Sequence, residues 1–132
     1  PNKNAVKGHN WERKIINWIK PFWKWAKSSR ATSRQLDNCK VDINFIPLLI
    51  QAKATLIRPN FQKLWEECMR LIDIEYPPKE AKELKKKPYV VFHKDTSRKA
   101  GPKAPHTETM TVTAKFGREL LELWAENNKD ED

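Results

Sequence analysis

The chain has 132 residues, of which 39% are hydrophobic and 33% charged, and its formal net charge is +9. This length fits one domain with its own hydrophobic core, and no apolar run approaches the length of a membrane span. The basic balance favours a polyanionic partner, most commonly nucleic acid, although anionic lipid or solubility alone would also account for it.

The two cysteines and the start of the chain indicate a cytoplasmic protein without membrane contact. Cys39 and Cys68 have no CxxC spacing, which favours reduced thiols over a disulfide. The first residues are polar and basic with no apolar block behind them, so they lack the pattern of a signal peptide.

Positive charge is concentrated in the first forty residues, where Glu12 and Asp37 are the only acids. Residues 1–7 are predicted to be a flexible basic arm. Apolar residues then recur every three or four positions and predict a helix over residues 9–20, which Pro21 ends. Glu12 falls in the first turn of this helix, on the side of the apolar stripe, so we expect its carboxylate at or near the core. Complementing the helix dipole is the structural alternative.

Three segments follow this helix: one in which apolar and polar residues loosely alternate, one that is polar and one that is largely apolar. Residues 22–27 predict an edge strand, and residues 28–40 predict a long basic loop that suits phosphate contacts, with a solvated loop as the alternative. Residues 41–55 predict two apolar strands joined by a tight turn near residues 44–47. The later elements are a helix over residues 60–73, a charged connector over 79–87, a strand over 88–92, a basic loop over 93–106, a strand over 108–116, a helix over 117–127 and an acidic tail over 128–132.

The order of these elements, αβββαββα, predicts an α/β domain with a mixed sheet flanked by helices. The strand–helix–strand unit over residues 48–92 predicts a parallel crossover, and the two late strands predict an antiparallel pair.

Polar side chains interrupt the apolar segment over residues 41–55. Gln51 and Lys53 are two positions apart and project from the same face of the second strand, and Asp42 on the preceding strand can reach that face. With Glu12 they offer oxygen ligands and a cation, which is the set that metal-assisted phosphodiester cleavage requires. A half-buried hairpin whose polar residues simply face water is the alternative.

In this chemistry Glu12, Asp42 and Gln51 would supply oxygen ligands, and the main-chain carbonyl of Ala52 would be a further ligand. Hard oxygen ligands favour Mg²⁺ or Mn²⁺ over zinc. Lys53 would orient the attacking water or stabilise the developing oxyanion.

The same residues carry a resemblance to a known family. Asp42 followed nine positions later by Gln51-Ala-Lys53 resembles the PD-(D/E)xK signature of restriction-endonuclease-like nucleases. Gly8-His-Asn-Trp-Glu12-Arg13 resembles the GxxxER opening of the archaeal-type Holliday junction resolvases. In that family a basic segment with Arg and Ser, matched here by Arg30 and Ser33, comes next.

Two departures from the family pattern lie in the strands. Val41 stands where a proline usually precedes the aspartate, and Gln51 stands where the family has an acid. Glutamine still offers a carbonyl oxygen, but the site loses one negative charge, so metal affinity should fall.

The resemblance implies a single nuclease domain over residues 1–132 with a restriction-endonuclease-like, mixed five-stranded sheet. It implies a structure-selective, Mg²⁺-dependent endonuclease, with Mn²⁺ as a substitute. This enzyme would resolve four-way DNA junctions by paired cleavage as a homodimer, in a prokaryotic cell or a phage-infected host. The catalytic residues would be Glu12, Asp42, Gln51 and Lys53. The DNA-binding residues are expected to be Arg13, Lys27, Arg30, Ser33, Arg34, Lys40, Lys94, Arg98 and Lys99.

The dimer surface is expected at Leu123 and Trp124 or on the exposed side of the late strand pair. Two other functions stay open. One is a non-catalytic basic module that binds DNA or RNA on the same fold and has lost the acid at position 51. The other is a sequence- or mismatch-specific nuclease of the same superfamily.

Overall fold

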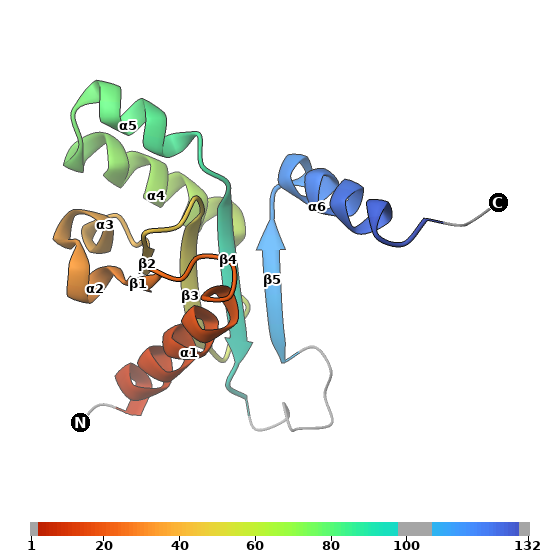
Figure 1. Cartoon of the computed structure of the whole chain (residues 1–132). Coiled ribbons are helices and arrows are strands. Elements are labelled where there is room, and N and C mark those ends of the chain that lie inside the picture. Colours follow the sequence, from red (N-terminus) through yellow and green to blue (C-terminus); the bar gives the residue numbers. More distant parts are fainter. Residues whose placement is uncertain (1–2, 98–106, 130–132) are drawn as a thin grey trace.

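The structure is a computed structural model that describes residues 3–97 and 107–129 (Figure 1). Within these ranges the chain forms a mixed α/β fold with helices on both sides of a sheet. The elements are α1 (Lys3–Ile19), β1 (Lys27–Ser28), α2 (Ser29–Thr32), α3 (Arg34–Asn38), β2 (Ile43–Asn44), β3 (Leu49–Thr55), α4 (Phe61–Glu75), α5 (Pro78–Lys85), β4 (Tyr89–Asp95), β5 (Glu108–Val112) and α6 (Ala114–Glu126).

The strands form two sheets. β3 and β4 pair in parallel, with Gln51 opposite Val91, and β4 pairs with β5 in antiparallel register. The expected parallel crossover, now seen to run through α4 and α5, and the late antiparallel pair are therefore confirmed. β1 and β2 form a separate antiparallel ribbon of two residues each.

The continuous five-stranded sheet expected from the sequence is not seen in the described residues. The chain before β2 meets β3 through the N–H of Asp42, which donates to the carbonyl of Ile50 at 2.8 Å. Phe45, in the turn expected over residues 44–47, has a left-handed φ of 66°. In the described residues β2 pairs with β1 and forms no ladder with β3.

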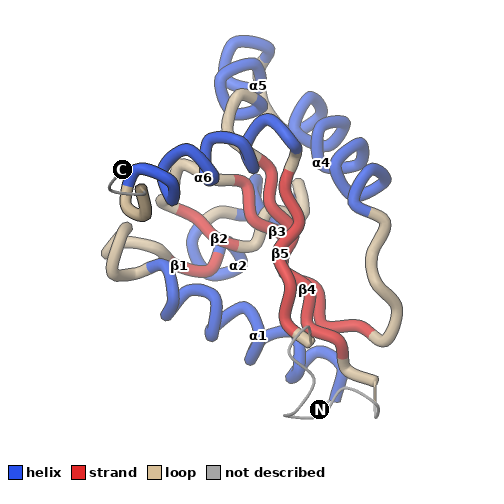
Figure 2. The backbone as a smooth tube through the Cα atoms, turned by 90° about the vertical axis from the view of Figure 1, so that its right-hand side faces the viewer, coloured by secondary structure: helices blue, strands red, loops and turns tan. Residues whose placement is uncertain are grey.

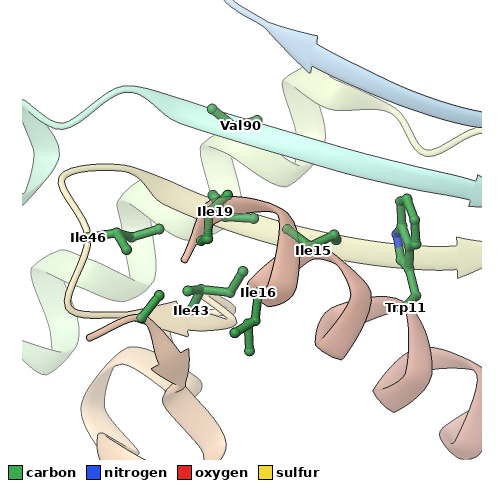
Figure 3. Packing of buried hydrophobic residues seen from close by; sticks show 9 residues of the cluster. Trp11, Ile15, Ile16, Ile19, Ile43, Ile46 and Val90 are labelled. Atoms are coloured by element: carbon green, nitrogen blue, oxygen red, sulfur yellow. The ribbon is translucent and has the colours of Figure 1, made fainter. Parts of the chain in front are cut away.

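Two hydrophobic clusters lie on opposite faces of the three-stranded sheet. Neighbouring strand residues alternate between them, so Ile50 and Val90 pack with α1 while Leu49 and Tyr89 pack with α4 and α5. Figure 3 shows the α1 side, where Trp11, Ile15, Ile16 and Ile19 pack with Ile43, Ile46 and Val90. α6 follows β5 and has no buried residue, and it lies beyond β5 from α1 (Figure 1) and toward the viewer in Figure 2. Phe116 in its first turn packs against the α1-side cluster.

Several boundaries differ from the expectations. α1 begins at Lys3, so residues 3–7 are helical and not a loose arm, and Glu12 lies in the middle of the helix and not in its first turn. The expected loop over residues 28–40 holds two short helices, and Ser33 caps the second by accepting from the N–H of Leu36 at 3.2 Å. The connector over residues 79–87 is largely the helix α5. These helices are short and polar, and they lack the repeated apolar positions from which a helix is predicted.

None of the helices that the structure describes is long and apolar enough to cross a bilayer.

Candidate active site

Asp42 is the best-anchored polar residue of the predicted site. Its main-chain carbonyl accepts from the N–H of Ser29 at 2.8 Å, and its N–H donates to β3 at Ile50. Its side-chain Oδ2 accepts from the N–H of Ala52 at 2.7 Å. The carboxylate is therefore fixed at the junction of the β1–β2 ribbon with β3.

The pKa of the Asp42 carboxyl is shifted by burial and by nearby charged groups. Burial raises the pKa of this carboxyl from 3.8 to about 7, against the hydrogen bond from Ala52, which lowers it. The negative charge of Glu12 raises this pKa further, and the positive charge of Lys53 lowers it. Glu12 on α1 and Lys53 on β3 are thus each within electrostatic reach of Asp42, which lies just before β2.

Glu12 lies on the inner side of α1, between the core residues Trp11 and Ile15. Its exposed fraction is 9%, as expected from its position on the apolar stripe. Its Oε1 lies 3.7 Å from Nη2 of Arg30, whose side chain is about half exposed. This distance is an ion pair without a short hydrogen bond, so Arg30 remains able to turn toward another anion.

Gln51 does not present a free carbonyl oxygen to this site. Its Oε1 accepts a hydrogen bond of 2.7 Å from the hydroxyl of Tyr89, and only 4% of the residue is exposed. Burial raises the pKa of the Tyr89 hydroxyl, and the negative charge of Asp42 is among the smaller causes that raise it further. Sequence reasoning missed Tyr89, although a hydroxyl in an otherwise apolar strand needs a partner.

The residues fit a divalent cation in part. The negative charge of Glu12 acts on Asp42, and the raised pKa of Asp42 means that the positive charge of Lys53 does not offset its burial. A cation placed there would lower that pKa. However, no three His, Cys, Asp or Glu side chains of the described residues form a metal-binding group. Ala52 reaches the site through its N–H, while the role expected for its carbonyl stays a prediction.

Most of the expected DNA-binding residues are available on the surface. Those that are exposed are Arg13, Lys27, Arg30, Arg34 and Lys40. The hydroxyl of Ser33 is used as a helix cap. Lys94 is half-buried, with its Nζ 6.0 Å from the ring centre of Trp11 and 3.9 Å from Oε2 of Glu108. Arg98 and Lys99 lie outside the described residues.

The chain matches no protein-family model, and comparison with curated proteins and with solved structures gives no match either.

Proposed function

We propose that this protein is a Mg²⁺-dependent endonuclease that cleaves branched DNA, with four-way junctions as its preferred substrate. The observation that carries the proposal is the convergence at Asp42. An acid from α1 and a lysine from β3 both act on the pKa of this carboxyl, although they are distant in the chain. A carboxyl whose pKa is strongly shifted by burial and by charged neighbours is characteristic of catalytic sites.

Each side chain has a distinct role in this proposal. Glu12 and Asp42 would hold the metal ion, with Gln51 as a weak neutral contributor because Tyr89 already occupies its oxygen. When bound, Mg²⁺ would polarise the phosphate and lower the pKa of the attacking water. Lys53 would place a positive charge on the phosphate as negative charge develops. Arg30 would exchange its long contact with Glu12 for a contact with the DNA backbone.

The basic surface near the site suits backbone contacts. Lys27 is exposed on β1, Arg34 on α3 and Lys40 two residues after α3. Lys27 lies near Asp42 because β1 pairs with β2, with Lys27 opposite Asn44. Such contacts carry shape and charge information more than base sequence, which favours a branched substrate over a fixed recognition sequence.

The homodimer is part of the same proposal. The exposed fractions of Leu123 and Trp124 on α6 are 64% and 66%, and that of Met110 on β5 is 48%. A second copy covering this apolar surface would place two active sites in one particle, as paired cleavage requires. Light scattering should give the mass of a dimer, and Trp124→Asp should shift it to that of a monomer.

The decisive experiment is cleavage of synthetic junction, flap, mismatch and linear duplex substrates in Mg²⁺ and in Mn²⁺. We expect nicking of the junction with the linear duplex spared, and loss of nicking in Asp42→Asn and Lys53→Ala. Lys63→Ala, an exposed lysine on α4, is the matched control and should nick normally. Undiminished nicking by the Asp42→Asn chain would refute the proposed site.

The second candidate is a basic module that binds nucleic acid without cutting it. The hydrogen bond between Tyr89 and Gln51 favours it, because the position where the resolvases have an acid is neutral and its oxygen is engaged. This candidate predicts salt-sensitive binding with no nicking in either metal. Gln51→Glu separates the two, since a large gain in nicking is expected only of a weakened catalyst.

A further inference from the structure

Exposed aromatic side chains flank the β1–β2 ribbon, with Phe22 and Trp25 before β1 and Phe45 after β2, and the function proposed above leaves them unused. The exposed fractions are 75% for Phe22, 66% for Trp25 and 56% for Phe45. Side chains of this size normally bury most of their area, so a group of them on the surface of one part of the fold marks an interaction site.

The register of the ribbon brings the two parts of this group together. β1 and β2 are antiparallel, with Lys27 opposite Asn44. Trp25 lies just before β1 and Phe45 lies just after β2, so both belong to the same end of the ribbon. Their neighbours Ala26 and Ile46 are buried in one hydrophobic cluster, which holds the two segments against the same core.

Both segments have a fixed backbone that directs the rings outward. The N–H groups of Phe22 and Trp23 donate to the carbonyl of Ile19, and the N–H of Ala26 donates to the carbonyl of Trp23. Trp23 packs against the core, which leaves Phe22 and Trp25 outside.

Phe45 has a left-handed φ of 66°, and its N–H donates to Oδ1 of Asn44 at 2.8 Å. A large side chain in this conformation is strained, and such strain concentrates at functional positions.

The charge around the aromatic residues selects the partner. Lys20, Lys24 and Lys27 lie in the same segment, and none of them forms a salt bridge within the part of the chain that the structure describes. The sequence has no acid between Glu12 and Asp37. The Nζ of Lys24 lies 5.2 Å from the ring centre of Trp25, so a cation and an aromatic face are offered together. Aromatic faces beside cations bind single-stranded nucleic acid, in which bases stack and phosphates pair with lysine.

We propose that Trp25 and Phe45, with the lysines beside them, form a stacking site for unpaired bases of a DNA strand that leads to Asp42. Asp42 precedes Phe45 by three residues, so their Cα atoms are at most about 10 Å apart. Bases unstacked at a branch point would then be held close to the cleavage site. The inference rests on the proposed function for the identity of the polymer, and binding can be measured without cleavage.

The test is binding of fluorescein-labelled oligothymidine of about 15 nucleotides, of blunt duplex and of a four-way junction, in EDTA. Trp25→Ala and Phe45→Ala should each weaken oligothymidine binding roughly tenfold, with blunt duplex changed less than about twofold. Trp25→Phe and Phe45→Trp keep an aromatic face and should bind as the wild type does. Ile74→Ala, an equally exposed apolar residue on α4 at 65%, is the matched control. Stacking itself is read from 2-aminopurine in the oligonucleotide, whose fluorescence should be quenched by the wild type and not by Trp25→Ala.

Equal losses on duplex and single strand, or no loss on either, would overturn the stacking site. So would Trp25-dependent binding to phosphatidylserine vesicles with oligothymidine binding unchanged, which would indicate a membrane surface. The two proposals fail separately. If oligothymidine binding depends on Trp25 and Phe45 but the junction is not nicked, the nuclease proposal fails and the stacking site stands. If the junction is nicked but binding does not depend on Trp25 and Phe45, the stacking site fails and the nuclease proposal stands.

Discussion

Oδ2 of Asp42 accepts a hydrogen bond from the main-chain N–H of Ala52, ten residues further along the chain, at 2.7 Å. This contact fixes the carboxylate beside β3, within the influence of Glu12 and Lys53. The geometry of the proposed active site depends on it.

The first prediction concerns pH. Burial raises the pKa of Asp42 to about 7, above the 3.8 of an ordinary carboxyl, so the folded state holds this proton more tightly than the unfolded state does. The contribution to stability is present below about pH 4 and is lost as pH rises toward about 7, with a slope of at most about 1.4 kcal/mol per pH unit. Urea unfolding in EDTA at about pH 5 and about pH 8 measures it. In Asp42→Asn this component should disappear, and an unchanged slope in that variant would contradict the assignment.

The second prediction concerns metal binding. Mn²⁺ should raise the unfolding temperature, because a cation between Glu12 and Asp42 stabilises only the folded state, by about 2.7 kcal/mol at 100 times its dissociation constant. The shift should grow as pH rises through about 7, where Asp42 loses its proton. Gln51→Glu should enlarge the shift and lower the stability without metal, since it adds a buried charge. Samples in EDTA without added metal give the baseline unfolding temperature. An equal Mn²⁺-induced shift in Asp42→Asn would mean that Mn²⁺ binds elsewhere.

The third prediction concerns the buried pair Tyr89 and Gln51. Tyr89→Phe leaves the oxygen of Gln51 without its donor and should cost about 1–3 kcal/mol of unfolding free energy. Gln51→Leu leaves the hydroxyl unpaired and should cost a similar amount. A double-mutant cycle by urea unfolding should give a coupling of about 1 kcal/mol, and strict additivity would mean that the hydrogen bond contributes nothing.

The fourth prediction concerns the α1 side of the core. Ile15 is fully buried in α1, so Ile15→Ala should lower the unfolding free energy by about 2–5 kcal/mol. Ile57→Ala removes a side chain that is 82% exposed and should change it by less than about 0.5 kcal/mol. Equal effects of the two substitutions would show that α1 does not pack as described.

The fifth prediction separates backbone strain from charge at Lys40. Its φ of 65° is left-handed, which a side chain disfavours by about 1–2 kcal/mol, while glycine in turn loses about 0.5–1 kcal/mol of chain entropy. Lys40→Gly should therefore stabilise the fold by up to about 1 kcal/mol, and Lys40→Ala should not. Both remove the charge, so both should weaken junction binding equally in EDTA if Lys40 contacts DNA. Thermal unfolding and fluorescence anisotropy report the two effects independently.

Much of the secondary structure follows from local patterns in the sequence. The spacing of Trp11, Ile15 and Ile19 predicts the inner side of α1. The helix expected to begin at Asn60 begins at Phe61, and Asn60 caps it by accepting from the N–H of Lys63. The parallel pairing of β3 and β4 follows from the length of the helical connection between them. The helices α2, α3 and α5 were not predicted from the sequence. Few of their residues are buried, and none of these helices has apolar residues repeated along its whole length.

By itself the sequence determined the basic charge, the α/β order and the four polar residues Glu12, Asp42, Gln51 and Lys53, because residue types and their spacing need no knowledge of distant contacts. Only the tertiary structure decided how these side chains are used. Tyr89 lies 38 residues after Gln51, yet its hydroxyl occupies the oxygen that the sequence assigned to a metal. The pairing of β2 with β1, and not with β3, likewise divided the expected sheet. Hydrogen bonds and burial between distant segments depend on how the chain packs, and local periodicity carries no record of them.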